Sequence, residues 1–160
     1  MVIILMGVTG SGKTTAGRQL AESLGWKYFD ADDFHSATNV AKMKRGVPLN
    51  DEDRKPWLES LQRLIQERLA NDQPAVLACS ALKQIYRDVL IIDERVKLVY
   101  LKGDYDLIRA RLSARSNHYM NPALLESQFQ TLEEPTGALC IDIQSPPDEI
   151  VGTIRTQFEV

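Results

Sequence analysis

Residues 7–14 read GVTGSGKT and directly follow VIILM at residues 2–6. The first run is apolar and rich in β-branched residues, which is typical of a buried strand. The second has the spacing of a phosphate-binding loop between a strand and a helix. In such loops glycines let successive backbone N–H groups converge on phosphate oxygens, and the next helix directs its positive end at the same anion. The segment therefore predicts a nucleoside triphosphate site.

Individual residues of this loop are suited to bind the phosphates of a nucleoside triphosphate and its Mg²⁺ ion. We expect phosphate contacts from the backbone of six successive residues: Gly7, Val8, Thr9, Gly10, Ser11 and Gly12. Lys13 should reach the β- and γ-phosphates, and Thr14 should place its hydroxyl on Mg²⁺. A glycine-rich turn that matches by chance is the alternative, but the strand before the loop and the helix after it both favour phosphate binding.

Length and composition predict one globular domain covering residues 1–160, with 44% apolar residues to form its core. The formal net charge is −3 and no dense run of Lys and Arg occurs, which argues against a nucleic-acid partner and favours a small molecule. Cys79 and Cys140 fall in apolar runs and are predicted to be buried core residues. With no signal-like N-terminus and no membrane-length apolar stretch, we expect a cytoplasmic protein that does not contact a membrane.

Strand-like and helix-like patterns alternate along the chain. Strands are expected at residues 2–6, 28–29, 75–79, 98–101 and 139–143. Helices are expected from near residue 13 to residue 24, from 56 to 69, at 82–89, from 107 to 112 and at 150–158, with Pro56-Trp57 opening the second of them. This alternation predicts an α/β fold of three layers, in which a five-stranded parallel sheet is covered on both faces.

An acidic turn follows the second expected strand, with Asp30, Asp32, Asp33 and His35 within six residues. In a parallel sheet ligands bind beyond the carboxyl ends of the strands, so this turn should face the phosphate loop. One carboxylate could hold Mg²⁺ through water and another could accept a proton from a substrate hydroxyl. A solvated acidic turn is the alternative, and an incidental loop histidine is the alternative for His35. Since the third strand ends without an acidic residue, Asp30 or Asp32 must serve the metal.

Basic residues are expected on the other sides of the same cleft. Arg54 is suited to bind the carboxylate of an acidic substrate with two hydrogen bonds. Ser80, Lys83 and Arg87 follow the third strand and are expected to reach the cleft as well.

A pair of arginines, Arg111 and Arg115, is spaced to share a helix face. One should lie against the nucleotide, and the other on a mobile flap at residues 115–119 over the transferring phosphoryl group. A surface helix of exposed arginines is the alternative.

Six blocks of the chain resemble the thermoresistant type of gluconate kinase, a family of small P-loop kinases related in fold to shikimate and adenylate kinases. The blocks are GVTGSGKT (7–14), DADDFH (30–35), KMKRGVPLNDEDRKPWL (42–58), CSALKQIYRDVL (79–90), YLKGDYDLIRARLSARSNHYM (100–120) and LLESQFQTLEEP (124–135). The resemblance covers nearly the whole length and implies a P-loop kinase fold with a lid. It implies that ATP, with Mg²⁺, phosphorylates gluconate at its terminal hydroxyl to give 6-phosphogluconate. Dimers are common among such relatives, which makes a homodimer a candidate assembly.

The resemblance also implies roles for individual residues. Residues 7–14 would bind ATP, and Asp30 and Asp32 would serve metal and substrate. Candidates for gluconate recognition are His35, Arg54 and Lys83, while Arg111 would pack on adenine and Arg115 would lie in the lid. By analogy with shikimate kinases, Asp32 would orient or deprotonate the attacking hydroxyl, and Lys13 and Arg115 would spread the charge of the transferring group. Asp33 departs from the family pattern and is assigned no catalytic role.

Two other functions remain open from the sequence. The chain could phosphorylate another small polar acceptor, such as shikimate or a nucleoside monophosphate. It could instead be a GTP-dependent switch, although neither an Asn-Lys-x-Asp nor an Asp-x-x-Gly motif occurs in the chain.

Overall fold

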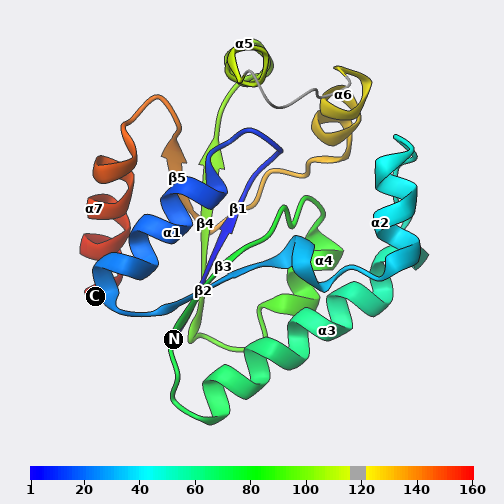
Figure 1. Ribbon diagram of the computed structural model, residues 1–160. Coiled ribbons are helices and arrows are strands. Elements are labelled where there is room, and N and C mark those ends of the chain that lie inside the picture. Colours follow the sequence, from blue (N-terminus) through cyan, green and yellow to red (C-terminus); the bar gives the residue numbers. More distant parts are fainter. Residues whose placement is uncertain (116–121) are drawn as a thin grey trace.

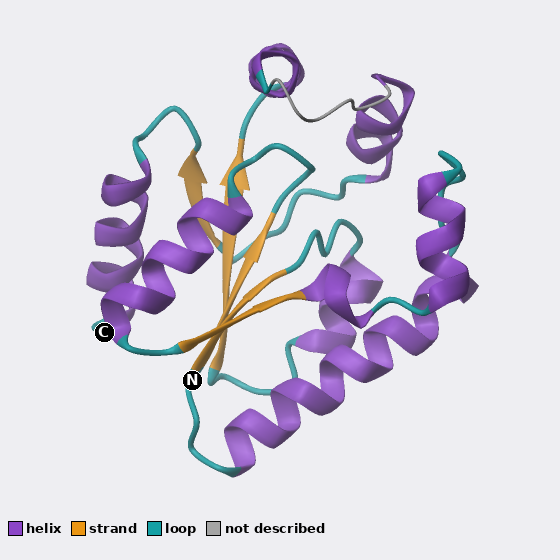
Figure 2. Ribbon diagram, viewed as in Figure 1, coloured by secondary structure: helices purple, strands orange, loops and turns teal. Residues whose placement is uncertain are grey.

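The computed structural model describes residues 1–115 and 122–160 and shows a parallel sheet between two layers of helices (Figures 1 and 2). The five strands lie in the order β2-β3-β1-β4-β5, and every pairing is parallel. They are β1 Val2–Met6, β2 Lys27–Asp30, β3 Ala75–Ala78, β4 Val96–Lys102 and β5 Leu139–Asp142. The predicted α/β fold with a five-stranded parallel sheet is confirmed.

The helices connect these strands and cover both faces of the sheet. They are α1 Lys13–Leu24, the short 3₁₀ helix η1 Ala31–Phe34, α2 Ala37–Lys44, α3 Asp51–Ala70, α4 Gln84–Leu90, α5 Tyr105–Ala114, α6 Pro122–Thr131 and α7 Pro147–Phe158. Helices α1 and α7 lie side by side on one face, whereas α3 and α4 pack on the other (Figure 1). Among the described helices, none is both long and apolar enough to cross a membrane.

Strand β1 lies at the centre of the sheet and is buried on both sides. Ile3 and Leu5 join the core under α1 and α7, while Val2, Ile4 and Met6 join the core under α3 and α4. This alternation explains why the sequence of β1 is apolar throughout, since each face of a doubly covered strand contacts a helix layer. The phosphate-binding loop therefore follows directly on a strand that is buried on both faces.

The start of α3 differs from the prediction, which placed it at Pro56. The helix begins at Asp51, and Pro56 lies inside it. Asn50 Oδ1 accepts a hydrogen bond from the Asp53 backbone N–H at 2.7 Å, and Asp53 Oδ2 accepts one from the Asn50 N–H at 3.0 Å. This reciprocal capping box satisfies donors that a helix start leaves unpaired, and it starts the helix before the proline.

Two smaller expectations also need correction. Leu82 precedes α4, which begins at Gln84, so it lies in the connection after β3. Cys79 is buried as predicted, but Cys140 is exposed. The reason is that β5 forms an edge of the sheet, where alternate side chains face away from the core. Both cysteines are free thiols.

The capping box gives a test of where α3 begins. We expect Asn50→Ala to lower the free energy of unfolding by about 1 kcal/mol, because the Asp53 N–H loses its acceptor. Urea denaturation followed by circular dichroism measures this change. Gln66→Ala, at an exposed position in the same helix, should change stability by less than about 0.5 kcal/mol. Equal effects of the two substitutions would contradict the assigned start.

Candidate active site

A cavity of about 430 Å³ lies beyond the carboxyl ends of β1, β2 and β3. Its walls come from the loop after β1, from η1, from the connection between α2 and α3, from the loop after β3 and from α6. In Figure 1, α2 and α6 lie at the end of the molecule toward which the strand arrows point. The sheet therefore brings segments from most of the chain length to one site, as expected for the switch point of a parallel sheet.

The loop after β1 has the backbone shape of a phosphate cradle. Gly10 and Gly12 have φ angles of 77° and 91°, in the left-handed region that favours glycine. A Cβ added to Gly10 would lie only 2.9 Å from Leu112, so this position is also closed to larger residues. Gly12 is the N-cap of α1 and supplies no side-chain acceptor to the first turn of that helix.

The start of α1 fits an anionic ligand. None of the hydrogen bonds formed by the described residues satisfies the backbone N–H of Gly10, Gly12, Lys13 or Thr14. The Ser11 hydroxyl is buried beside them and likewise lacks a partner within the described structure. Unpaired donors at the positive end of a helix are the arrangement that binds phosphate groups. The residues present therefore fit the triphosphate site that the sequence predicts.

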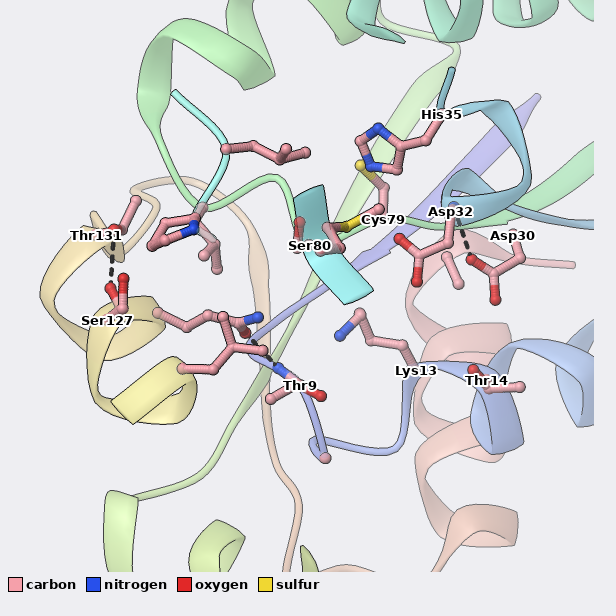
Figure 3. Close-up of a pocket in the computed structure, with 18 of the residues that line it drawn as sticks. Thr9, Lys13, Thr14, Asp30, Asp32, His35, Cys79, Ser80, Ser127 and Thr131 are labelled. Carbon is pink, nitrogen blue, oxygen red and sulfur yellow. Dashed lines mark hydrogen bonds between the residues drawn. The ribbon is translucent and has the colours of Figure 1, made fainter. Parts of the chain in front are cut away.

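Lys13 spans this loop and points into the cavity (Figure 3). Its Nζ donates to the carbonyl oxygens of Gly7 and Val8 at 2.9 Å each. Burial lowers the pKa of Lys13 to about 8, and the nearby Asp32 carboxylate opposes this shift. An anionic ligand that reached Nζ would favour the charged ammonium form.

The acidic turn lies next to Lys13 and Thr14, on the side of the view opposite Ser127 and Thr131 (Figure 3). Asp30 ends β2 and caps η1, because its Oδ1 accepts a hydrogen bond from the Asp32 N–H at 2.9 Å. Loss of surrounding water raises the pKa of the Asp32 carboxyl, repulsion from Asp30 adds to the shift, and attraction to Lys13 opposes it. Asp32 and Asp33 are both exposed, but Asp33 does not line the cavity. Of the three carboxylates in this turn, Asp30 and Asp32 therefore line the cavity and Asp33 does not.

The His35 side chain lies on one wall of the cavity and is held there by Trp57 and Asn39. Its ring stacks on Trp57 with centroids 4.4 Å apart and planes inclined by 11°. The Asn39 Nδ2 amide lies 3.4 Å from His35 Nδ1 and also donates to the Asp53 carbonyl at 2.8 Å. Because an amide NH₂ only donates, Nδ1 must be the acceptor, which places the ring proton on Nε2. Burial, with a contribution from Arg54, lowers the pKa of His35 to about 4, so the ring is neutral near pH 7.

Arg54 lines the cavity beside His35, as the sequence predicts. It extends from the first turns of α3, and its Nη1 donates to the Leu49 carbonyl at 2.7 Å and to the Tyr86 hydroxyl at 3.0 Å. Arg115, which ends α5, also lines the cavity. Residues 116–121, which contain most of the expected lid, lie outside the described residues.

Two other basic residues were expected to reach the cleft but do not line the cavity. Lys83 does not line the cavity and instead pairs with Asp51 at 2.9 Å. Arg87 is only 2% exposed and is bonded to protein carbonyls, so it does not reach the cleft. Arg111 does not line this cavity and donates from Nη2 to the Ile143 carbonyl at 2.6 Å, in the connection that follows β5. Its expected contact with adenine stays a prediction.

One wall of the cavity was missed by the sequence analysis. Helix α6 contributes Leu124, Ser127, Gln128 and Thr131, and the Gln128 side-chain oxygen accepts a hydrogen bond from the Thr9 N–H at 2.7 Å (Figure 3). These positions are spaced at i, i+3, i+4 and i+7, so they share one face of the helix. This polar stripe was the available signal, but the sequence does not show which side of α6 faces the loop.

A phosphate-binding loop at the central strand, with acidic and basic side chains facing it, defines a P-loop kinase. The family model for shikimate kinase matches residues 9–140. The chain is 48% identical to the probable gluconokinase of Mus musculus, covering 84% of this chain and 83% of that protein. It is 40% identical to the thermoresistant gluconokinase of Escherichia coli K12, covering 95% and 90%.

A solved structure agrees with these sequence relationships. The gluconokinase of Sinorhizobium meliloti 1021 superposes with a TM-score of 0.84 at 39% identity, covering 94% of this chain and 87% of that one. The chain therefore belongs to the gluconokinase family, as its sequence blocks indicate.

The environment of His35 predicts how the ring titrates. We expect the imidazole to remain neutral until the pH approaches 4, because protonation would place a charge in partly dehydrated surroundings beside Arg54. An unfolded chain takes up this proton near pH 6.5, so the free energy of unfolding should fall as the pH drops from about 6.5 toward 4. NMR titration of labelled histidine measures the pKa directly, and His35→Gln assigns the signals of the two histidines. A His35 ring that titrates near 6.5 would contradict the assigned environment.

Proposed function

We propose that this protein transfers the γ-phosphoryl group of ATP to the terminal hydroxyl of D-gluconate, giving 6-phosphogluconate. The observation that carries the proposal is the juxtaposition of Lys13 and Asp32 in a cavity that also contains Arg54 and His35. One half of this cavity is suited to phosphates and the other to an anionic polyol. Membership of the gluconokinase family supports the choice of acceptor.

The loop and the acidic turn hold the nucleotide end in this proposal. The unpaired N–H groups at the start of α1 bind the phosphates, and Lys13 leaves the loop carbonyls to contact them. Thr14 and Asp30 would hold Mg²⁺, since both face the cavity with oxygen atoms of the type that this ion prefers. When bound, Mg²⁺ neutralises phosphate charge and helps to orient the transferring group.

Three side chains orient the acceptor. The Arg54 guanidinium binds the carboxylate of gluconate, because its planar fork matches two carboxylate oxygens. The His35 Nε2 proton is available to a hydroxyl oxygen, since Nδ1 is already occupied by Asn39. The charge of Asp32 acts on Lys13 more strongly than that of Asp30, and Asp32 accepts a hydrogen bond or a proton from the attacking hydroxyl. Lys83 has no place in this set, because it lies outside the cavity.

Little covalent chemistry is required of the protein in such a transfer. Lys13 and Arg115 supply positive charge where negative charge spreads over the transferring group, and Asp32 fixes the direction of attack. Water must be kept away, because an open site would hydrolyse the nucleotide instead. Positioning and electrostatic stabilisation therefore account for most of the expected rate.

An acceptor panel tests the proposal. We expect ATP consumption to depend on gluconate, with kcat/KM at least about 100-fold higher than for shikimate, nucleoside monophosphates or no acceptor, because the pocket must pair every polar group of its substrate. Coupled detection of ADP gives the rates, and 31P NMR identifies the phosphorylated product. Shikimate belongs in the panel because the shikimate kinase model matches the chain. Lys13→Ala is the background control and should abolish turnover, and preference for another acceptor would overturn the proposal.

The carboxylate assignment has its own test. We expect Asp32→Asn to lower kcat by about 10²- to 10⁴-fold, the range for loss of a positioned base, with little change in the KM for ATP. Asp33→Asn is the matched control, because Asp33 is exposed and outside the cavity. Steady-state kinetics with gluconate measure both variants. A larger loss of kcat in Asp33→Asn than in Asp32→Asn would show that the wrong carboxylate has been assigned.

A further inference from the structure

The guanidinium of Arg54 is held by hydrogen bonds to two different segments of the chain. Its Nη1 donates both to the Leu49 carbonyl at 2.7 Å and to the Tyr86 hydroxyl at 3.0 Å. Leu49 precedes α3, whereas Tyr86 lies in α4, more than thirty residues further along the chain. The guanidinium carbon also lies 5.4 Å from the centroid of the Tyr86 ring, a favourable position for a cation on an aromatic face.

The direction of the Tyr86 hydrogen bonds is determined by Asp51. The Tyr86 hydroxyl donates its one proton to Asp51 Oδ1 at 2.5 Å, so its oxygen can only accept from Arg54. Lys83 Nζ donates to the same carboxylate oxygen at 2.9 Å. The hydrogen bonds from Tyr86 and Lys83 hold the pKa of Asp51 below its usual range, so this acceptor stays ionised. Burial, with the Asp51 hydrogen bond, raises the pKa of Tyr86, which therefore keeps its proton.

The remaining donors of Arg54 are left for a ligand. Within residues 1–115 and 122–160, no hydrogen bond occupies Nη2 or Nε of this side chain, and Arg54 lines the cavity. Nη2 and Nε form one edge of the planar guanidinium, which can bind both oxygens of a carboxylate. Anchoring one nitrogen fixes the plane of the group, and therefore the direction of the free edge.

We propose that Tyr86, held by Asp51, is a positioning residue that aims the free edge of Arg54 at the carboxylate of the acceptor. The inference deepens the proposed function and rests on it, because it assigns a cause to the selection of an anionic sugar acid over a neutral polyol. Tyr86 acts only through Arg54 and touches neither the nucleotide nor the reacting hydroxyl. Lys83 belongs to the same network from the solvent side, through Asp51.

Removing the Tyr86 hydroxyl isolates this role. We expect Tyr86→Phe to raise the KM for gluconate about 5- to 30-fold, the effect of a lost charge-assisted hydrogen bond. The kcat and the KM for ATP should change less than about threefold, because the groups at the phosphates are untouched. Tyr100→Phe is the matched control: its hydroxyl lies 3.5 Å from Glu134 Oε1, also beside a carboxylate, but outside the cavity. It should leave all three parameters near those of the wild type.

A double-mutant cycle distinguishes positioning from general damage. In an Arg54→Gln background, Tyr86→Phe should cause no further rise in the KM for gluconate, because the residue it orients is gone. Sorbitol, which carries a hydroxymethyl group in place of the carboxylate, serves as a competitive inhibitor. Its inhibition constant should be the same in the wild type and in Tyr86→Phe. Asp51→Asn keeps an oxygen acceptor for Tyr86 and should raise the KM less than Asp51→Ala does.

The outcomes separate this inference from the proposed function. A wild-type enzyme that does not phosphorylate gluconate would overturn the proposed function. A wild-type enzyme that does so, but in which Tyr86→Phe weakens sorbitol and gluconate equally or has its full effect without Arg54, would overturn the positioning role alone. Thermal unfolding of every variant, expected to remain cooperative, shows that the kinetic changes occur in folded protein.

Discussion

The unpaired backbone N–H groups at the start of α1 are the constraint around which the site is built. A helix cannot satisfy its own first donors, and here Gly12 offers no side chain to do so. The strand order places β1 at the centre of the sheet, with β3 and β4 as its neighbours, so these donors emerge in the middle of the carboxyl edge. Every other cavity group, from Asp32 on one side to Gln128 on the other, is positioned relative to this anion site.

The buried Arg87 guanidinium holds two walls of the cavity together. It donates to the carbonyls of Ala81 and Leu82, in the loop after β3, and to that of Glu133, just beyond α6. Ala81 has a φ of 44°, a left-handed conformation that costs a non-glycine residue about 1 kcal/mol or more and persists only where neighbours enforce it. Because burying an unpaired charge is unfavourable, separating these carbonyls from Arg87 would be costly, and the guanidinium links the loop after β3 to the segment beyond α6.

The sequence was sufficient to predict which residues follow the strand ends and therefore lie near the site. It was not sufficient to predict the orientation of side chains on the surrounding helices. Strand ends placed Asp32 and His35 at the cavity correctly, because the carboxyl ends of parallel strands share one edge. Lys83 was expected at the cavity, but it precedes α4 by one residue and its side chain pairs with Asp51 outside the cavity lining, an orientation that only the packing of that helix shows. The contribution of Gln128 depends on which face of α6 meets the loop. Such orientations arise from packing between distant segments, and no local pattern encodes them.

The half of the cavity at the phosphate loop and the half at His35 and Arg54 are built from different kinds of groups. This difference affects how the specificity of the protein can change. The nucleotide half relies on backbone N–H groups, which do not depend on most side-chain identities. The half that we propose for the acceptor contains side chains that are each held by a second partner, as His35 is by Trp57 and Arg54 is by Tyr86. A substitution among these supporting groups would redirect acceptor recognition and leave phosphate binding intact. The physical separation of the two halves explains how one kinase fold can serve acceptors of different chemistry.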